Sequence, residues 1–412
     1  MAEVNMKYDF DTVINRRGTD SVKWDVAENE LPMWVADMDF RLAPEIEQAI
    51  KKRLEHGVFG YSVIPDEWYK AYMNWWQNRH GVSFKRAGLI FCTGVVPAIS
   101  SIVRKLTTPN ENVVIQTPVY NVFFNSIINN GCRVLESPLV YDRKSSSYSM
   151  DLKDLEAKLS DPQTTLMILC NPHNPVGKIW DKITLEKIGR LAEKHNVTVI
   201  SDEIHCDITE PGKNYVPFAS VSDICREISI TCIAPTKAFN MAGMQSAAVY
   251  AENPVLHHKV WRALNTDEIA EPNSFACTAA IAAFNEGAGW LDAMRKYVSE
   301  NRKLVYDFIE KELPEISVVK SNATYLLWLD ISKTGLSAAE IRENTGLFLT
   351  DGSVYGDCGK NFLRMNIACP KTTLEDGLQR LKKATSIYLN HLKSLKKGDE
   401  AVPDKEAGKN RE

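Results

Sequence analysis

The stretch TCIAPTKAFNMAGMQ, residues 231–245, places a lysine just after an apolar run. The run at 228–233 predicts a buried strand, Pro235 breaks it, and Lys237 follows two residues later. A lysine in that position is ordinarily a solvated surface charge. A chemical role for Lys237 therefore needs support from the ends of the other strands that the sequence predicts.

The chain has 412 residues, of which 44% are hydrophobic and 25% charged, and its net charge is −4. This length supports a large core and more than one domain, and the charge offers no basic footprint for nucleic acid. No secretory signal opens the sequence, and no apolar run reaches the roughly 20 residues of a membrane span. We therefore expect a cytoplasmic protein that binds neither nucleic acid nor membrane.

The cysteines and histidines give no sign of a metal site. Nine cysteines are scattered along the chain without a C-x-x-C pair, which favours neither a disulfide framework nor bound zinc. Several lie inside apolar runs, where a free thiol behaves as a small hydrophobic side chain. The eight histidines are equally dispersed, H-E-x-x-H is absent, and no metal is expected.

Short apolar runs alternate with helical patterns over the first two thirds of the chain. The segment 185–196, for example, places Leu185, Ile188 and Leu191 on one helical face. Such alternation predicts an α/β fold with a mostly parallel sheet covered by helices on both faces. The predicted strands are LIFC (89–92), NVVIQ (112–116), CRVLES (132–137), TLMILC (165–170), VTVIS (197–201) and ISITCI (228–233).

The C-terminal third has a different pattern, with strands predicted at 323–330 and 361–368 and a leucine-striped helix after them. It predicts a smaller α+β C-terminal domain beside the large one. The expected parts are an N-terminal segment that packs with the small domain (1–45), a large ligand-binding domain (46–285), the small domain (286–395) and a polar, disordered tail (396–412).

Four predicted strand ends carry polar groups, and ligands of parallel sheets bind outside the carboxyl ends of the strands. TGVVPAIS (93–100) begins a helical pattern whose free N–H groups either hold a phosphate or start an ordinary capped helix. In NPHNPVGK (171–178), two Asn-Pro pairs fix a rigid turn that aims an asparagine or merely reverses the chain. Asp202 either caps a helix or faces a cation. The fourth end carries Lys237.

One ligand uses all four groups. Pyridoxal 5′-phosphate (PLP) carries a phosphate, an aldehyde that condenses with a lysine amine, and a protonated ring nitrogen that pairs with a carboxylate. Each group has an ordinary structural explanation when taken alone, but their occurrence at successive strand ends favours the cofactor. Nucleotide sites lack their signatures, since the chain has neither G-x-G-x-x-G nor G-x-x-x-x-G-K-[ST].

These motifs resemble those of the fold-type I, aspartate-aminotransferase-like PLP enzymes. More narrowly, the sequence is similar to the MalY/PatB-type carbon–sulfur lyases, a group that includes cystathionine β-lyases and cystalysin. The similarity extends to about residue 395. It is carried by WVADMDF (34–40), GYS (60–62), TGVVPA (93–98), TPVYNVFF (117–124), SDEIH (201–205) and APTKAFNMAGM (234–244).

The resemblance implies a role for each matching residue. Lys237 would bond to the cofactor aldehyde and later move protons, and Asp202 would pair with the ring nitrogen. Asn174 would hydrogen-bond the ring oxygen, and Tyr120 would stack on the ring. Lys237, Asp202 and Tyr120 are thus the expected catalytic residues.

The resemblance also implies how the phosphate and the substrate are held. The backbone at Val95 and Val96 and the Thr236 hydroxyl would bind the phosphate. Arg364 would bind the substrate α-carboxylate through a bidentate fork, which suits a guanidinium. Tyr61 would reach the phosphate of the neighbouring subunit's cofactor, which requires a homodimer.

Val35 and Ala36 would line the substrate cleft from the N-terminal segment, and Asn174 and Tyr61 would border the same cleft. Two positions depart from many aminotransferases. Gln245 stands where an arginine often grips the phosphate. His205, expected beside the cofactor, stands where a tyrosine is common. Both departures agree with the lyase group.

The resemblance implies a PLP-dependent β-lyase that cleaves cystathionine or a related cysteine S-conjugate to pyruvate, ammonia and a thiol. An aminotransferase of the same fold is the alternative, because transamination shares every step up to loss of the α-proton. A third hypothesis is a regulatory protein that binds a partner protein and retains the site as a vestige. No residue in the sequence indicates which group beyond sulfur is accepted.

Overall fold

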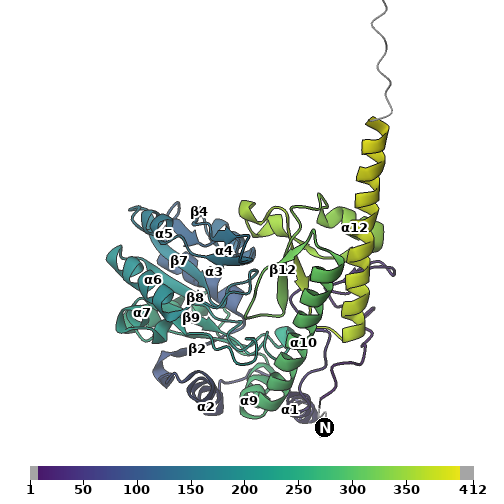
Figure 1. Cartoon of the computed structure of the whole chain (residues 1–412). Helices are drawn as coiled ribbons and strands as arrows, with labels where there is room; N and C mark the ends of the chain where they lie inside the picture. Colours follow the sequence, from purple (N-terminus) through teal and green to yellow (C-terminus); the bar gives the residue numbers. More distant parts are fainter. Residues whose placement is uncertain (1–7, 400–412) are drawn as a thin grey trace, which may run out of the picture.

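The structure is a computed structural model that describes the backbone of residues 8–399 and the side chains of residues 8–388. Figure 1 shows a large domain, coloured blue to teal, beside a smaller part formed by the green and yellow C-terminal elements. The predicted α/β class is confirmed: a mostly parallel sheet lies between helices, and a second, smaller sheet follows.

The large sheet has seven strands in the order β2-β10-β9-β8-β7-β3-β4. Every neighbouring pair is parallel except those of β10, which runs antiparallel to β9 and β2. Its strands are β2 (Leu89–Cys92), β3 (Asn112–Ile115), β4 (Arg133–Glu136), β7 (Thr164–Cys170), β8 (Thr198–Asp202), β9 (Ser229–Ile233) and β10 (Ala247–Tyr250).

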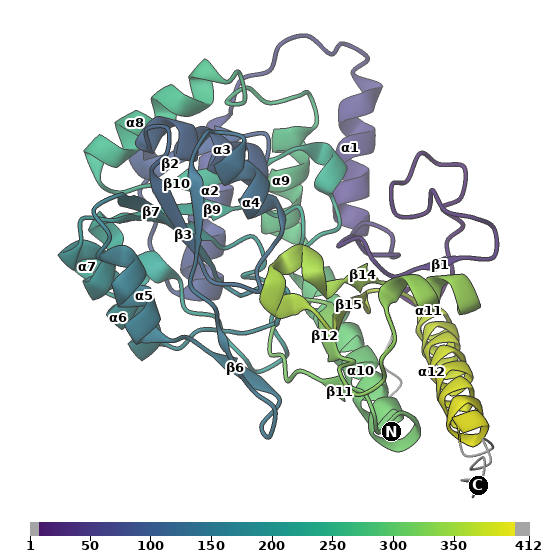
Figure 2. The same cartoon turned by 90° about the horizontal axis from the view of Figure 1, so that it is seen from above.

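Helices cover both faces of this sheet, as Figure 2 shows. One face carries α3 (Val95–Leu106), α4 (Val122–Ile128) and α8 (Pro254–Thr266). The other face carries α5 (Leu152–Leu159), α6 (Lys182–Lys194) and α7 (Asp223–Glu227). Alternation along β7 explains the two cores, because Leu166 and Ile168 join one apolar cluster while Met167 and Leu169 join the other.

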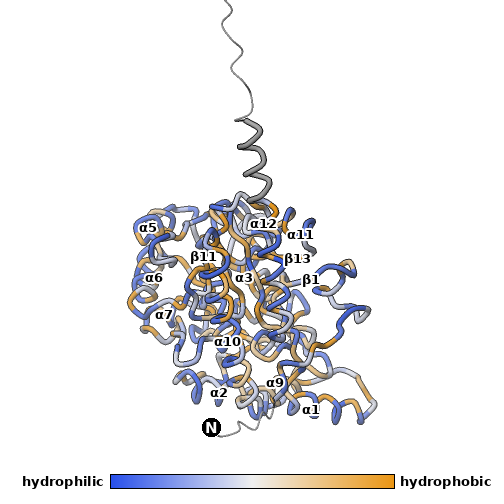
Figure 3. Tube along the Cα trace, turned by 45° about the vertical axis from the view of Figure 1, so that its right-hand side comes forward, coloured by the Kyte–Doolittle hydropathy of each residue, from blue (hydrophilic) through white to orange (hydrophobic). Residues whose placement is uncertain are grey.

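A third apolar cluster joins the large sheet to the rest of the chain. In this cluster, α1 (Pro44–Glu55) and α2 (Asp66–Trp75) pack on α9 (Ala276–Glu286). The next helix, α10 (Ala288–Glu312), connects α9 to the small sheet. Figure 3 shows the outcome, with hydrophobic segments gathered inside and hydrophilic ones outside. No helix in the described range is both long and apolar enough to cross a membrane.

The small sheet is antiparallel and has the order β11-β12-β15-β14. Its strands are β11 (Ser317–Val318), β12 (Leu326–Asp330), β14 (Thr350–Asp351) and β15 (Phe362–Asn366), accompanied by α11 (Ala338–Thr345) and α12 (Lys371–Asp399). The N-terminal strand β1 (Leu31–Pro32) pairs with β13 (Leu347–Phe348), so the N-terminal segment lies against the C-terminal part of the chain here. The exact domain boundaries stay a prediction.

The remaining elements are short. A hairpin is formed by β5 (Val140–Asp142) and β6 (Ser147–Ser149). Single turns of π or 3-10 helix are η1 (Trp76–His80), η2 (Arg86–Gly88), η3 (Phe218–Ser220), η4 (Ala242–Met244), η5 (Gly352–Tyr355) and η6 (Asp357–Gly359). The run LKSLKK (392–397) continues α12 to Asp399, because leucine and lysine favour helix. The helix thus includes 396–399, where the tail was expected to begin, and 400–412 lie outside the described residues.

Candidate active site

Three parallel strands end side by side at one edge of the large sheet. Cys170 at the end of β7 pairs with Asp202 at the end of β8, and Asp202 pairs with Cys232 near the end of β9. The segments that follow these strands therefore start from one place, as expected for a ligand site at carboxyl ends. A pocket lies there, lined by Ala36, Val95, Val96, Tyr120, Cys170, Asn174, Asp202, Ile204, His205 and Lys237.

Lys237 enters this pocket from the loop after β9. Its Nζ donates a hydrogen bond of 2.7 Å to the backbone oxygen of Ala36. Burial lowers the pKa of the Lys237 amine to about 8, and the Arg364 charge acts in the same direction. Asp37 and Asp202 oppose that decrease. An amine with this pKa is partly neutral near physiological pH, so it can act as a nucleophile and a base.

Asp202 is a buried carboxylate to which no described cationic side chain comes within ion-pair distance. The backbone N–H of Ile204 donates to its Oδ1 at 3.1 Å. Burial raises the pKa of Asp202 to about 7, while the Ile204 hydrogen bond and the Lys237 charge act to lower it. A carboxylate in this setting favours a cationic ligand group beside it. The protonated ring nitrogen of PLP is such a group.

The N-terminus of α3 borders the same pocket through Val95 and Val96. Gly94 precedes the helix with extended backbone, and in the described chain no side chain caps its first N–H groups. Those groups and the positive end of the helix dipole are suited to a phosphate. Thr236 is buried next to Lys237 in sequence but is not one of the lining residues.

Arg364 reaches the pocket region from β15 of the small sheet. It donates to Asn174 Oδ1 at 3.3 Å and to the Trp34 oxygen at 2.9 Å, and its planar group lies 5.1 Å from the centre of the Tyr355 ring. Its buried Nε has no hydrogen-bond partner in the part of the chain that the structure describes. The backbone N–H of Asn174 lies 3.4 Å from Cys170 Sγ. Arg364 and Asn174 thus meet beside the lysine.

Tyr120 and His205 complete the polar lining. Burial raises the pKa of the Tyr120 hydroxyl, which keeps it protonated. Burial lowers the pKa of His205 to about 3, and the Lys237 and Arg364 charges add to that decrease. The imidazole is therefore neutral, and no described residue hydrogen-bonds to its buried Nδ1. The rings of Tyr120 and His205, two of the predicted site residues, thus both line the pocket.

Besides Thr236 and Arg364, two more predicted positions, Tyr61 and Val35, lie outside the lining. Tyr61 is fully exposed on the segment between α1 and α2, and the pocket of its own chain does not include it. Val35 lies next to Ala36 in the chain, and its backbone oxygen accepts a hydrogen bond of 2.7 Å from Asn366. Gln245, where many aminotransferases have arginine, is exposed at the end of η4. The roles of Tyr61 and Val35, like those of the other site residues, stay predictions.

Sequence reasoning missed two residues that touch this site. The Tyr325 hydroxyl donates to the Ala36 oxygen at 3.0 Å, and Asn366 donates to both Val35 and Asp37. Tyr325 follows a threonine at the start of a predicted strand, where no feature marks it. Asn366 had a signal, because it lies two residues after Arg364 on a strand and so shares its face.

A second polar cluster contains His80, Cys206 and Asp207, whose ligand atoms lie within 4.8 Å of one another. Asp207 already accepts from Trp75 at 3.0 Å and lies 2.9 Å from His80 and 3.4 Å from Arg79. An arginine at that distance opposes a metal cation. We interpret the cluster as a buried ion-pair network.

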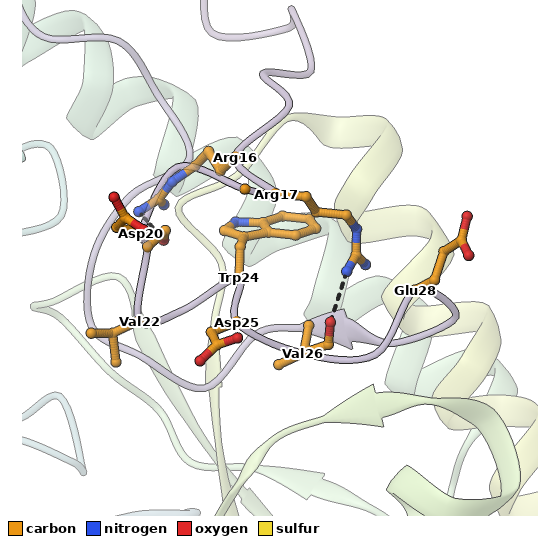
Figure 4. Close-up of a pocket in the computed structure, with 10 residues that line it drawn as sticks. Arg16, Arg17, Asp20, Val22, Trp24, Asp25, Val26 and Glu28 are labelled. Atoms are coloured by element: carbon orange, nitrogen blue, oxygen red, sulfur yellow. Dashed lines mark hydrogen bonds between the residues drawn. The ribbon is translucent and has the colours of Figure 1, made fainter.

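The N-terminal segment encloses a separate hollow of about 620 Å³, whose lining is drawn in Figure 4. The Arg17 guanidinium lies 5.3 Å from the centre of the Trp24 ring and donates to the Val26 oxygen at 3.1 Å. The lining of this hollow contains neither lysine nor histidine. The guanidinium of Arg16 forms ion pairs with Asp37 and Asp39. The smaller pocket around Lys237 therefore remains the candidate site.

Comparison with known proteins identifies the family of this chain. The model of the family "Aminotransferase class I and II" matches residues 29–381. Cystathionine beta-lyase PatB of Bacillus subtilis is 43% identical over 387 residues, which cover 92% of this chain and 100% of that protein. Protein MalY of Escherichia coli is 33% identical over 386 residues, 91% of this chain and 98% of MalY.

A solved structure is similar as well. Cystalysin from Treponema denticola, whose crystal structure contains a pyridoxal 5′-phosphate cofactor, has a TM-score of 0.88 and 32% sequence identity. The match covers 94% of this chain and 99% of cystalysin. The family match spans far more than half of the chain, and the PatB match spans nearly all of it. The chain therefore belongs to the aminotransferase class I and II family, and within it to the group of PatB and MalY.

Proposed function

We propose that this protein is a PLP-dependent carbon–sulfur β-lyase that cleaves cystathionine or a related cysteine S-conjugate to pyruvate, ammonia and a thiol. The observation that carries the proposal is a pocket lined by Lys237, Asp202 and Asn174, with Arg364 hydrogen-bonded to Asn174, in a chain 43% identical to a cystathionine β-lyase. The family match and the PLP-containing neighbour also bear out the cofactor expected from the sequence.

The pocket suits PLP group by group. Lys237 supplies the amine, Asp202 the anion for the ring nitrogen, and the start of α3 the donors for the phosphate. Tyr120 offers a ring for stacking, and Asn174 an amide at the pocket edge. When bound, PLP supplies an aldehyde that bonds to amines and a ring that withdraws electrons from the substrate Cα.

Lys237 is the proposed base at the substrate Cα. Its pKa of about 8 leaves enough neutral amine to accept the α-proton near neutral pH. The Ala36 oxygen, 2.7 Å from Nζ, accepts a hydrogen bond from that amine. The same lysine can return a proton to the departing thiolate or to the product, since an ammonium formed at Nζ is a general acid.

Asp202 stabilises the positive charge on the ring nitrogen, and Arg364 binds the negative charge of the substrate carboxylate. An ionised Asp202 favours a proton on the ring nitrogen, because an anion beside a base raises its affinity for protons. Arg364 orients the substrate through its α-carboxylate, with the unpartnered Nε as one available donor. Its contacts with Asn174 and Trp34 fix the guanidinium before substrate arrives.

Two assays on purified protein test the proposal. Cystathionine alone should yield pyruvate without any added keto acid. Borohydride should fix PLP covalently to the chain, and peptide mapping should find the label at Lys237. Failure to bind PLP, or a label on another lysine, would overturn the proposal.

Transamination by the same residues is the second candidate function, because the matched family is named for aminotransferases. It uses Lys237, Asp202 and Arg364 in the same way until the α-proton has been removed. The reactions then differ in where Lys237 delivers the proton. Product that forms only when a keto acid is supplied would favour transamination over elimination.

We also propose that the enzyme is a homodimer in the cytoplasm whose partner is a small amino-acid substrate. Support for the dimer comes from the segment between α1 and α2, where Phe59, Tyr61 and Val63 expose 45%, 104% and 82% of their surface. Such a patch is typical of an interface. An additional regulatory protein partner stays the weaker alternative, since the residues needed for chemistry are all present.

A further inference from the structure

The segment of residues 34–40, here called the active-site segment, is bound by side chains from both domains. Its Ala36 oxygen accepts from Lys237 at 2.7 Å and from the Tyr325 hydroxyl at 3.0 Å. Lys237 comes from the large domain and Tyr325 precedes β12 of the small sheet. This one carbonyl is therefore shared between the proposed base and a buried hydroxyl of the other domain.

Asn366 holds the residues on either side of that carbonyl. Its Nδ2 donates to the Val35 oxygen at 2.7 Å and to the Asp37 oxygen at 2.6 Å, while its Oδ1 accepts from Ala368 at 2.8 Å. The side chain is 1% exposed, so these bonds form away from competing water. With both neighbouring oxygens held, the Ala36 peptide has little freedom to turn.

Asn240 ties the same segment to the large domain. Its amide accepts from the Met38 N–H at 2.9 Å and donates to the Met38 and Phe40 oxygens at 3.0 and 2.9 Å. Asn240 lies three residues after Lys237, and Asn366 lies two residues after Arg364. Lys237 and Arg364 are thus each followed by an asparagine that hydrogen-bonds to the same segment.

We propose that the Ala36 carbonyl is the resting acceptor for the Lys237 amine whenever the lysine is not bonded to PLP, and that Asn366 is the positioning residue that holds this carbonyl in place. The proposal rests on the function proposed above, because it gives Lys237 a free state during turnover. It assigns a reaction role to a residue that touches neither substrate nor cofactor.

The physical consequence concerns the protonated lysine. A carbonyl oxygen at 2.7 Å accepts a hydrogen bond from an ammonium more strongly than from a neutral amine. It therefore stabilises the protonated Lys237 that forms once the lysine has taken the α-proton of the substrate. It also holds Nζ in one place, which keeps the base near the atom that it serves. Loss of Asn366 frees the carbonyl to turn away, and the ammonium then loses this acceptor.

The test compares Asn366→Ala with Asn301→Ala in the full-length chain. Asn301 is a close match, because it is 3% exposed and its Nδ2 donates to two backbone oxygens, those of Ile367 and Cys369, each at 2.9 Å. Neither of these hydrogen bonds involves the active-site segment. The two variants should therefore lose similar thermal stability, which measures the purely structural contribution.

The readout is the rate at which PLP bonds to the cofactor-free protein, followed by absorbance from about pH 6 to pH 10, since only the neutral amine reacts. The quantity compared is the midpoint of the curve of this rate against pH. In Asn366→Ala we expect that midpoint to fall by about one pH unit. We also expect kcat to fall about tenfold with KM within about twofold, because Arg364 still binds the carboxylate. Asn301→Ala should leave the midpoint and kcat close to those of the natural protein.

A second variant keeps the proposal testable if Asn366→Ala does not fold. Tyr325→Phe removes the hydroxyl that competes for the Ala36 oxygen, so the midpoint should rise by about half a pH unit. Tyr72→Phe is the control, because it removes a buried hydroxyl that has no hydrogen-bond partner among the described residues. It should leave the midpoint unchanged.

The outcomes separate this proposal from the function on which it rests. If PLP does not bond to Lys237 in the natural protein, the proposed function fails. If PLP bonds there but Asn366→Ala behaves like Asn301→Ala, or Tyr325→Phe does not raise the midpoint, only the resting-acceptor proposal is overturned. Shifts of opposite sign in the Asn366 and Tyr325 variants support it.

Discussion

Asp202 and Glu203 are adjacent buried carboxyls that the fold uses in different ways. Burial raises the pKa of each to about 7. Glu203 accepts hydrogen bonds from Ser201, Tyr215 and Phe218, whereas Asp202 accepts one from Ile204 and faces the pocket. Successive residues at a strand end point to opposite faces, so only one of the two reaches the ligand.

This difference gives a prediction at the scale of one residue. Asp202→Asn should lower kcat by roughly 10²–10⁴-fold, because an amide does not hold a proton on the ring nitrogen. Glu203→Gln should retain kcat within a few-fold, since its amide can still accept from Phe218. Steady-state pyruvate release by both variants, saturated with PLP, makes the comparison.

A large loss of kcat in Glu203→Gln at full PLP occupancy would contradict the assignment. An Asp202→Asn variant with near-natural kcat would also contradict the assignment. Thermal melts of both proteins exclude simple unfolding as the cause.

At the scale of an element, the turn at 171–178 is pressed against the small domain. The Gly177 oxygen accepts from Asn322 at 2.9 Å and from Ala323 at 3.1 Å. A Cβ on Gly177 would overlap the Ser321 side chain and lie 3.0 Å from the Ala323 oxygen, and its φ is +66°. The glycine is therefore required by both the backbone angle and the close contact.

Gly177→Ala should destabilise the protein by about 3 kcal/mol or more, because strain and overlap add. Gly212→Ala is the matched control: its φ is +78°, but its Cβ would meet open space. It should cost only about 1 kcal/mol. Denaturant unfolding measures both, and equal losses would show that contact with the small domain is unimportant.

The same turn gives a prediction about acid. His173 is fully buried, its Nε2 lies 2.9 Å from the Pro118 oxygen, and burial lowers its pKa to about 4. The unfolded chain takes up this proton near pH 6.5 and the folded chain only near pH 4. Stability from the neutral imidazole is therefore complete above about pH 6.5 and is lost as pH falls towards 4.

His173→Gln should remove this acid sensitivity. Between pH 7 and pH 5 the natural protein should lose about 2 kcal/mol more than the variant, as measured by denaturant unfolding. Replacement of the exposed His56 by Gln serves as the control and should leave the natural pH dependence in place. A variant with the same acid loss as the natural protein would contradict this account.

At the scale of the whole molecule, the exposed Tyr61 belongs to the proposed dimer. If it completes the neighbouring subunit's site, Lys237→Ala and Tyr61→Ala should each be nearly inactive alone. When the two are refolded together at equal amounts, half of the dimers are mixed, and each mixed dimer contains one intact site. Activity should return to about a quarter of the natural level, and light scattering should give the dimer mass.

No recovery on mixing, with both variants dimeric, would place Tyr61 outside the neighbour's site. A monomeric natural protein would overturn the dimer itself. Either result leaves the pocket around Lys237 intact, because its lining comes from one chain.

Much of the large domain could be predicted from local pattern. The six predicted strands became β2, β3, β4, β7, β8 and β9 with ends shifted by at most one residue. The sequence did not indicate β10, which begins with two alanines, a residue depleted in strands, or the hairpin β5–β6, whose strands have only three residues each. Asp202 was expected just after a strand and is the last residue of β8.

The sequence by itself determined the alternation of strands and helices, and which reactive groups follow the strands, because both depend on residues close together in the chain. Only the tertiary structure decided that Ala36 meets Lys237 across 201 residues and that Asn366 grips Val35 across 331. Contacts of that range depend on how two domains and an N-terminal segment pack together, and no local pattern encodes that packing.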